Sequence, residues 1–468
     1  MIRLKVLLLA GGSLLAACTG EKTTTSTSAA PAAVPATSSE ANSAPAAAMP
    51  TGFVTVDGQD FEIDGEEYQY VGVNFWYGAY LGAGGDIGNV ERLRKELDDL
   101  KALGVTNLRV LGSSEDGPMK ASIKPAFRNE TDVYNEELLK GLDVLLAEMA
   151  KRDMKAVIYL NNFWEWSGGM GTYLSWVNDG EYVDLGDPDK PWPAYVLHTM
   201  KFYSNEEANR MFKDYIEAVV TRTNSVTGVR YVDDPTIMSW QLANEPRAGY
   251  NAEKPENHAM PAFYAWIEDI AGYIQSLDPN HLVSTGNEGF MGCADNDACF
   301  LEAHDTSAID YLTFHMWPYN WGWLDDQDME GTFDRVLANS GAYIDKHIGF
   351  ANELGKPIVI EEFGLPRDGG ALSVESTTDF RDRFYSYVYD RIEQSASTDG
   401  PLVGSNIWTW GGAGRAEHPD GNWQDGDRSY TGDPPQEPQG LNSVFDTDES
   451  TMALMKDHAI ELGVQSAD

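Results

Sequence analysis

The stretch Met238-Ser-Trp-Gln-Leu-Ala-Asn-Glu-Pro-Arg247 decides how the rest of the chain can be interpreted. An apolar run from Ile237 to Leu242 ends abruptly in polar residues and a proline. Because proline cannot continue a central β-strand, the strand is predicted to stop at Glu245. The pattern therefore places a carboxylic acid at the end of a buried strand, between the amide of Asn244 and the guanidinium of Arg247.

A second stretch, Pro357-Ile-Val-Ile-Glu-Glu-Phe-Gly364, repeats the arrangement of an apolar strand that ends in acidic residues. Two carboxylic acids on one cleft suit the cleavage of a glycosidic bond, because one can protonate the leaving oxygen while the other attacks or activates water. We therefore expect Glu245 and Glu362 to form one active site. Taken alone, Asn-Glu-Pro could start a helix, and Glu361 and Glu362 could be solvated loop charges, so the wider pattern has to decide.

Short apolar, β-branched runs alternate with stretches that carry apolar residues at helical spacing. Alternation of this kind predicts a parallel sheet, and eight repeats predict an α/β fold, a single (β/α)8 TIM barrel. Two shorter strands, near Phe53–Val56 and Phe61–Ile63, predict an N-terminal β-hairpin that caps the bottom of the barrel. A doubly wound open sheet is the alternative, but no glycine-rich phosphate fingerprint follows the first strand. The eight predicted strands are Tyr70–Asn74, Asn107–Val110, Ala156–Leu160, Ile237–Leu242, Leu282–Thr285, Tyr311–Phe314, Pro357–Ile360 and Val403–Trp408.

Polar and aromatic residues stand at the C-terminal end of every predicted strand, which is where TIM barrels carry their chemistry. Arg109 could keep a nucleophilic carboxylate ionised, and the charge of that carboxylate would raise the pKa of the acid beside it. Exposed tryptophans offer apolar faces to pyranose rings. His315 alone could be a hydrogen-bonded histidine of the core. The prediction of an active site therefore depends on finding such residues at all eight strand ends. They are Asn74-Phe75-Trp76, Arg109, Asn161-Asn162-Phe163-Trp164, Asn244-Glu245, Asn287-Glu288, His315-Met316-Trp317, Glu361-Glu362 and Trp408-Thr409-Trp410.

With these residues in place, the sequence resembles glycoside hydrolase family 5 and, within it, the endo-β-1,4-mannanase subfamily. The resemblance implies retaining, endo-acting hydrolysis of mannan, glucomannan or galactomannan, with Glu245 as acid/base, Glu362 as nucleophile, and neither a metal nor an organic cofactor. The motifs that carry it are Val71–Trp76, Asn107–Val110, Ser167–Met170, Tyr173–Trp176, Trp240–Arg247, Ser284–Gly289, His315–Pro318, Ile360–Gly364 and Asn406–Gly411. The substrate-binding residues that we expect from the strand ends and the resemblance are Arg109, Asn244, Arg247, Glu288, His315, Trp317, Trp408, Trp164 and Trp76.

The sequence departs from the family pattern in three places. Trp317 stands where the family often has a tyrosine that touches the nucleophile, and Tyr319 could substitute for it. The turn before Gly168 is a residue longer than usual, so Phe163 or Trp166 could replace Trp164 as an aromatic platform. An acidic, glycine- and proline-rich insertion, Ala413–Gly440, follows the last strand and is expected over the cleft.

Two rival functions stay open at this point. One is a family 5 hydrolase of another β-glycan such as cellulose, and the other is a non-catalytic glycan-binding lipoprotein on the same barrel. The formal net charge of −41 makes nucleic acid or an anionic membrane surface a poor partner. A neutral polysaccharide is compatible with that charge.

The N-terminal residues predict an exported protein with a lipid anchor. Residues 1–18 have a positive start and a short apolar run, and Leu15-Ala16-Ala17-Cys18 resembles a bacterial lipobox with Cys18 as the lipidated residue; an ordinary signal peptide is the alternative. Thr19 after the cysteine favours the outer membrane. Residues 19–50 are rich in Ser, Thr, Ala and Pro and predict a disordered tether before a catalytic domain at 51–468.

The two remaining cysteines, Cys293 and Cys299, lie six residues apart in a stretch that is expected to be a polar loop. In an exported protein this spacing favours a local disulfide.

Overall fold

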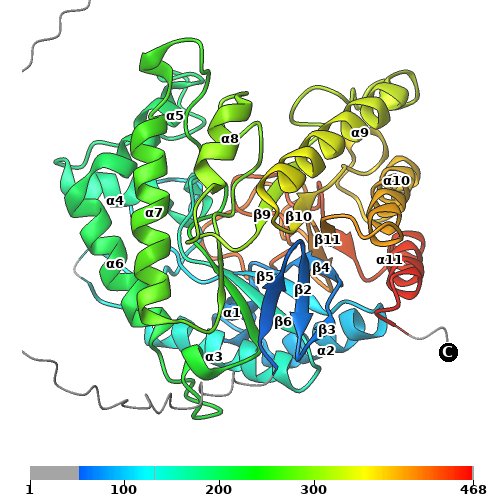
Figure 1. Ribbon diagram of the computed structural model, residues 1–468, viewed down its shortest axis with the longest axis horizontal. Helices are drawn as coiled ribbons and strands as arrows, with labels where there is room; N and C mark the ends of the chain where they lie inside the picture. The colour runs from blue at the N-terminus through cyan, green and yellow to red at the C-terminus, as the bar shows by residue number, and fades with distance from the viewer. Residues whose placement is uncertain (1–51, 131, 466–468) are drawn as a thin grey trace, which may run out of the picture. The chain divides into compact units, whose positions relative to one another are not determined.

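Eight parallel strands form the centre of the computed structural model, which describes residues 52–130 and 132–465 (Figure 1). Their order is β8-β7-β6-β5-β4-β11-β10-β9. Backbone hydrogen bonds from His315 N to Glu288 O (3.1 Å) and from Asp310 N to Val283 O (2.9 Å) join the two ends of this order. The predicted (β/α)8 barrel is therefore confirmed, and the alternative prediction of a doubly wound open sheet is wrong. The strands are β4 (Tyr70–Asn74), β5 (Asn107–Leu111), β6 (Lys155–Tyr159), β7 (Ile237–Gln241), β8 (Leu282–Ser284), β9 (Leu312–Met316), β10 (Ile358–Phe363) and β11 (Leu402–Ile407).

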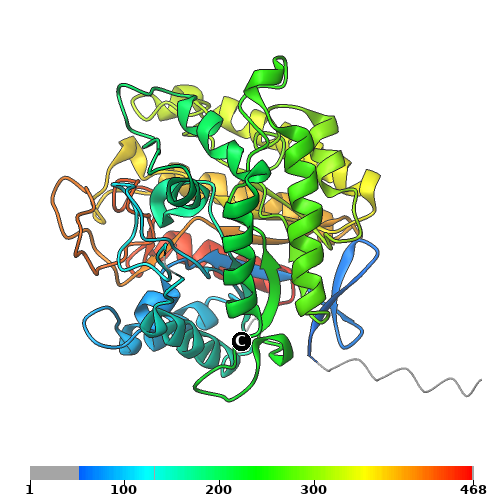
Figure 2. The ribbon, with the colours of Figure 1, turned by 90° about the vertical axis from the view of Figure 1, so that its left-hand side faces the viewer.

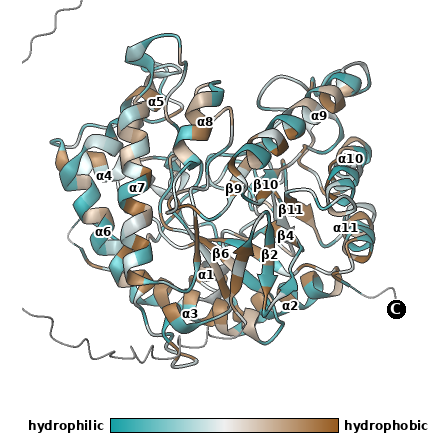
Figure 3. Cartoon of the chain, viewed as in Figure 1, coloured by the Kyte–Doolittle hydropathy of each residue, from teal (hydrophilic) through white to brown (hydrophobic). Residues whose placement is uncertain are grey.

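One helix follows each strand and packs outside the barrel. In α2, for example, Leu93, Leu97 and Leu100 are buried at helical spacing, and the Asn89 side chain caps the first turn by accepting from Arg92 N. Figure 3 shows hydrophobic residues on central strands such as β6 and hydrophilic residues along the outer helix α10. These helices are α2 (Val90–Ala102), α3 (Glu136–Ala150), α6 (Glu206–Val220), α7 (Met260–Leu277), α8 (Asp297–His304), α9 (Met329–Leu354), α10 (Asp379–Ala396) and α11 (Glu449–Glu461).

Shorter elements lie in the loops between strands and helices. The predicted insertion Ala413–Gly440 lies between β12 (Trp410–Gly412) and β13 (Val444–Phe445), which pair with each other in parallel (orange and red loops in Figure 2). The other short elements are α1 (Gly78–Gly82), α4 (Gly169–Val177), α5 (Ala194–Thr199), and the 3-10 helices η1 (Glu165–Ser167), η2 (Met200–Ser204), η3 (Tyr231–Asp233), η4 (Pro255–Asn257) and η5 (Asp368–Gly370).

The N-terminal cap closes the bottom of the barrel, as expected, but it has three antiparallel strands. They are β1 (Val54–Asp57), β2 (Asp60–Ile63) and β3 (Glu66–Glu67). Phe61 in β2 is fully buried and packs edge-on against Tyr311, with ring centroids 5.3 Å apart. This contact plugs the end of the barrel with apolar side chains, away from the C-terminal strand ends.

The predicted disulfide between Cys293 and Cys299 is wrong, because both cysteines are free and buried. The segment is not a polar loop: Cys299 lies in the first turn of α8, where Asn296 accepts from its backbone N–H at 2.9 Å. The two thiols contact each other, and burial raises the pKa of the Cys293 thiol well above its usual value. Both side chains pack in the core as small apolar groups.

The segments predicted as signal peptide (1–18, with Cys18) and tether (19–50) lie outside the described residues. Among the residues that the structure describes, none of the helices is long and apolar enough to span a membrane.

Candidate active site

A pocket of about 400 Å³ lies at the C-terminal ends of the barrel strands. It brings together most of the site residues that the sequence predicts, including both glutamates. The lining residues are Trp164, Trp166, Leu185, Trp192, Asn244, Glu245, Arg247, Glu288, Met291, Trp317, Asn320, Trp321, Glu362, Trp408, Gln436 and Glu437.

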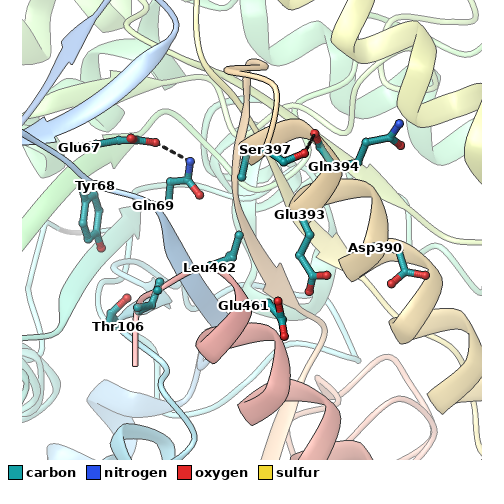
Figure 4. Close-up of a pocket in the computed structure, with 13 residues that line it drawn as sticks. Glu67, Tyr68, Gln69, Thr106, Asp390, Glu393, Gln394, Ser397, Glu461 and Leu462 are labelled. Carbon is teal, nitrogen blue, oxygen red and sulfur yellow. Dashed lines mark hydrogen bonds between the residues drawn. The ribbon is translucent and has the colours of Figure 1, made fainter. Parts of the chain in front are cut away.

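A larger cavity, of about 920 Å³, lies at the opposite end of the barrel (Figure 4). Its lining includes Thr106, which precedes β5, and Glu461, at the end of α11. Because TIM-barrel enzymes carry their active sites at the other end of the strands, the smaller pocket is the candidate active site.

Glu245 lies in the loop that follows β7, which ends at Gln241 and not at Glu245 as predicted, and it has an unusual backbone conformation. Its φ of +49° lies in the left-handed region, which costs energy for a residue with a Cβ and is a feature of functional sites. The carboxylate accepts hydrogen bonds from three rings. His315 Nδ1 lies 2.6 Å and Trp317 Nε1 3.3 Å from Oε1, while the Trp164 indole donates to Oε2.

Glu362 reaches the pocket because β10 contains a bulge. Ile360 pairs with Phe314 and Glu362 with His315, so Glu361 is an extra residue in the strand. Arg109 Nη1 donates to Glu362 Oε1 at 2.5 Å, and His315 Nδ1 lies 3.2 Å from Oε2. The reading of these glutamates as solvated loop charges is therefore wrong.

Arg109 lies behind the pocket and organises its base. It is fully buried and donates to Gln241 Oε1 (2.8 Å), Asn244 Oδ1 (2.8 Å) and Asn74 Oδ1 (3.1 Å) in addition to Glu362. Its guanidinium also lies 4.7 Å from the centre of the Tyr159 ring. With these partners Arg109 orients the Glu362 carboxylate and is not part of the pocket lining.

The electrostatics of the three central groups differ from the sequence expectation. Burial raises the pKa of Glu245, but the hydrogen bond and charge of His315, with the charge of Arg247, lower it to about 2. Burial raises the pKa of Glu362, and the charges of His315 and Arg109 offset this only in part. Burial lowers the pKa of His315, yet the surrounding carboxylates, Glu362 first, raise it well above its ordinary value. These pKa directions favour a proton on His315, whose Nδ1 lies at hydrogen-bond distance from Glu245.

One side-chain atom from each of Glu245, His315 and Glu362 lies within 4.8 Å of the other two, which is a spacing that could hold a metal ion. Both carboxylates of the group already accept hydrogen bonds, Glu245 from two indoles and Glu362 from Arg109. An oxygen–oxygen separation below 4.8 Å is shorter than the roughly 6.5–9.5 Å of inverting glycosidases and closer to the roughly 5–5.5 Å of retaining ones. The chemistry of the group fits a pair of catalytic carboxyls better than a metal centre.

Arg247 and the buried Glu288 form an ion pair on the Glu245 side of the pocket. The Arg247 guanidinium lies 5.3 Å from the centre of the Trp164 ring. Burial raises the pKa of Glu288 to about 7, although the charge of Arg247 lowers it. These two residues supply polar groups beside an aromatic face.

The predicted tryptophans separate into two groups. Trp164, Trp317 and Trp408 line the pocket, whereas Trp76 is fully buried and donates its indole N–H to the carbonyl of Gly432 in the insertion. Trp76 therefore anchors the insertion and does not reach the pocket. Trp166 also lines the pocket, and Phe163 is buried outside the lining.

Tyr319 does not replace the family tyrosine, because its hydroxyl donates to Asp326 Oδ2 at 3.2 Å and does not line the pocket. Trp317 occupies the position and donates to Glu245.

Sequence reasoning missed several lining residues that come from loops. Trp192, Gln436 and Glu437 belong to segments with no strand-end pattern. The proline-rich composition around Gln436 and its position after the last strand were the available signals. Gln241 was also missed, although its side chain joins Arg109 to Glu361 through bonds of 2.8 and 2.6 Å.

Comparisons with known proteins identify the family of this chain. Residues 51–466 match the family model described as GH family 5 beta-mannosidase-like. Mannan endo-1,4-beta-mannosidase 4 of Oryza sativa subsp. japonica is 30% identical over 375 residues, which cover 76% of this chain and 73% of the rice protein.

Two solved structures from Rhizomucor miehei are also similar. The glycoside hydrolase family 5 mannosidase superposes with a TM-score of 0.80 at 34% identity, covering 88% of this chain and 98% of its own, and a mutant of it has been solved in complex with mannosyl-fructose. The endo-1,4-beta-mannanase gives a TM-score of 0.64 at 25% identity, covering 88% and 100%. This chain, a glycoside hydrolase, therefore belongs to the GH family 5 β-mannosidase-like family.

Proposed function

We propose that this protein hydrolyses the β-1,4 bonds of mannan, glucomannan or galactomannan with retention of configuration. The observation that carries the mechanism is the spacing of Glu245 and Glu362, which have carboxylate oxygens within 4.8 Å of each other. Retaining enzymes need about 5–5.5 Å between the two carboxyl groups, whereas inverting enzymes leave about 6.5–9.5 Å for a water molecule.

In the first step Glu362 attacks the anomeric carbon while Glu245 protonates the glycosidic oxygen, so the leaving sugar departs and a glycosyl ester remains on Glu362. His315 passes its proton to Glu245 along their 2.6 Å hydrogen bond as the substrate binds. In the second step Glu245 takes a proton from water, the water attacks the anomeric carbon, and Glu362 is released. Arg109 holds the departing carboxylate in place.

Mannan is the best-supported substrate class. The rice relative and the two Rhizomucor relatives are named as mannan-cleaving or mannoside-cleaving enzymes, and one Rhizomucor structure is a complex with mannosyl-fructose. The pocket offers the aromatic face of Trp408 and the polar pair Arg247–Glu288, which suit pyranose rings and their hydroxyls. A neutral polysaccharide also carries no charge that a protein with net charge −41 would repel.

The test is reducing-end release from linear β-1,4-mannan and from carboxymethyl cellulose, side by side. Wild type should act on mannan, Glu245→Ala should lower kcat roughly 10²–10⁴-fold through loss of acid/base catalysis, and Glu362→Ala should abolish turnover. Glu353→Gln, an exposed change on α9, is the control.

Release from cellulose alone would retain the mechanism and reject mannan as the substrate. If wild type releases nothing from either polymer but binds mannan, a non-catalytic glycan-binding protein takes the place of the proposed enzyme.

We further propose that the chain is exported and anchored, most simply to the outer membrane, through a lipid on Cys18, with residues 19–50 as the tether and 51–468 as the catalytic domain. The lipobox-like Leu15-Ala16-Ala17-Cys18 supports this proposal. Cys18→Ser should move the protein from the membrane fraction to the soluble fraction. Unchanged membrane fractionation of that variant would reject the anchor.

A further inference from the structure

Glu361 is a fully buried carboxyl group next to Glu362, and the proposed mechanism gives it no step. Because it is the extra residue of the β10 bulge, its side chain points into the barrel and does not line the pocket. A buried charge is tolerated only where its partners offset the cost of removing it from water. The contacts of Glu361 therefore indicate what it does.

Hydrogen-bond donors hold both oxygens of the Glu361 carboxylate. Gln241 Nε2 donates to Oε1 at 2.6 Å and to Oε2 at 2.7 Å, and Arg109 Nε lies 3.5 Å from Oε2 as an ion-pair partner. Gln241 is itself oriented by Arg109, whose Nε donates to its Oε1 at 2.8 Å. Asn74 Nδ2 donates to the backbone carbonyl of Glu361 at 2.7 Å. These contacts hold the carboxylate in one position.

The ring of His315 links this carboxylate to the pocket. Its Nδ1 lies 2.6 Å from Glu245 Oε1 and 3.2 Å from Glu362 Oε2. Its Nε2 lies 3.9 Å from Glu361 Oε2 and has no hydrogen-bond partner among the described residues. The ring is fully buried, so solvent ions screen these charges only weakly.

The distance of 3.9 Å lets Glu361 attract the Nε2 proton without accepting it. A separation of this length is too long for a hydrogen bond, and therefore for direct transfer of a proton. It is short enough for electrostatic attraction, because an opposite charge within about 4–6 Å favours the charged form of its partner. The negative charge of Glu361 therefore stabilises the N–H group at Nε2.

The proton on Nδ1, in contrast, can move to Glu245 along the 2.6 Å hydrogen bond. Which nitrogen of a histidine keeps its proton depends on the partner of the other nitrogen. If His315 lost the Nε2 proton, the Nδ1 proton would stay between Glu245 and Glu362. Glu245 would then remain ionised, and no acid would face the glycosidic oxygen.

We propose that Glu361 is a positioning residue, which holds the Nε2 proton of His315 so that the Nδ1 proton is the one that reaches Glu245. The proton leaves Nδ1, the electron pair of that N–H bond stays on the ring, and an O–H bond forms on Glu245. The ring and the Glu245 carboxyl both become neutral, while Glu361 neither gains nor loses a proton. This inference rests on the proposed function.

Other charged groups also face His315, from four strands or the loops that follow them. Burial lowers the pKa of His315, but the surrounding carboxylates, Glu362 first and Glu361 among them, raise it well above its ordinary value. The charged groups are the carboxylates of Glu245, Glu288, Glu361 and Glu362 and the guanidinium groups of Arg109 and Arg247.

The first test is the pH dependence of kcat/KM on mannohexaose, which reports the ionisation of the free enzyme. Its alkaline limb reports the loss of the proton that His315 and Glu245 share. Glu361→Gln keeps the side-chain volume and an oxygen for Gln241 but removes the negative charge. The ring then holds its proton less strongly, so the alkaline limb should move to lower pH by about 1–3 units.

Two variants separate the charge of Glu361 from its packing. Glu361→Asp keeps the charge and should keep the alkaline limb at its wild-type pH, although the shorter side chain lowers kcat. Glu96→Gln removes another fully buried carboxylate, the ion-pair partner of Arg92 on α2, which is outside the pocket lining. It should leave the limb unchanged. A side chain that only supports the fold would lower kcat at every pH without moving the limb.

The second test follows the His315 ring itself and does not depend on activity. In protein with isotope-labelled histidine, nuclear magnetic resonance of the ring nitrogens shows which nitrogen carries a proton, and His315→Gln assigns the signals. Both nitrogens of the wild-type ring should be protonated at neutral pH. In Glu361→Gln the ring should lose its proton at lower pH, by the same shift as the alkaline limb.

If either the limb or the titration of His315 stays at its wild-type pH in a folded Glu361→Gln variant, the inference is overturned. If that variant does not fold, the neutral wild-type ring decides. A proton on Nε2 would support the inference, and a proton on Nδ1 would contradict it. If wild type cleaves no β-mannan, the proposed function fails, while the titration of His315 still tests the role of Glu361.

Discussion

At the residue scale, two consecutive glutamates show that position within a strand decides what a carboxyl group can do. The β10 bulge turns Glu362 toward the pocket and Arg109, whereas Glu361 points into the barrel and accepts two bonds from Gln241 Nε2 at 2.6 and 2.7 Å. The two side chains have the same chemistry, so the difference comes entirely from the register of the strand with β9.

Glu115 is another buried carboxyl whose surroundings have a measurable consequence. Burial raises its pKa to about 7, although the N–H of Gly169 donates to Oε2 at 2.7 Å and the charge of Arg128 lowers the pKa. Its Oε1 has no hydrogen-bond partner among the described residues.

Glu115→Gln should remove a pH dependence of the free energy of unfolding. A folded-state pKa above the ordinary value of 4.5 means that wild type keeps its full stability from this group below pH 4.5. As pH rises to about 7, it loses up to about 3 kcal/mol, which the amide does not lose. Urea unfolding at pH 5 and pH 8 measures the difference. Glu353→Gln is the exposed control, and parallel pH profiles of wild type and Glu115→Gln would contradict the assignment.

At the scale of elements, α1 and α3 cross at two glycines. A Cβ at Gly82 would lie 2.2 Å from the carbonyl oxygen of Gly141, and a Cβ at Gly141 would lie 2.0 Å from that of Ala79. Backbone atoms cannot move aside as a flexible side chain can. The crossing fixes the position of α1, which begins two residues after Trp76, the residue that anchors the insertion.

Gly141→Ala should therefore destabilise the protein by about 1–3 kcal/mol, the usual cost of overpacking. Gly349→Ala on α9 is the matched control, because its added Cβ meets no heavy atom within 4 Å outside its own helix. That control should stabilise by about 0.4–1 kcal/mol through lower entropy of the unfolded chain. Thermal and urea unfolding measure the free energy of unfolding of the two variants. Equal changes in both variants would show that α1 and α3 can move apart without loss of stability.

At the scale of the whole molecule, the net charge of −41 bears on how the protein meets a membrane. Anionic lipid headgroups repel such a chain, so its charge cannot supply attachment. If the proposed anchor is correct, attachment depends on the lipid on Cys18. Wild type should then remain with membranes in a high-salt wash, whereas Cys18→Ser should be soluble at every salt concentration. Salt-extractable wild-type protein would point to an electrostatic partner instead.

By itself, the sequence determined the barrel and predicted the two glutamates, Glu245 and Glu362, that line its pocket. Apolar runs, helical spacing and the proline after Glu245 act over a few residues, so their structural consequences can be worked out locally. The N-terminal cap was predictable for the same reason, although its third strand was not.

Only the tertiary structure decided how distant segments meet in the site. Arg109 and Glu362, 253 residues apart, share a hydrogen bond, and packing places Gln436 and Glu437 beside Trp408 while it withdraws Trp76. The low pKa of Glu245 and the free thiols of the core likewise depend on burial and on neighbours from other strands. Such proximity results from the closure of the barrel and the packing of its loops, which local sequence patterns do not encode.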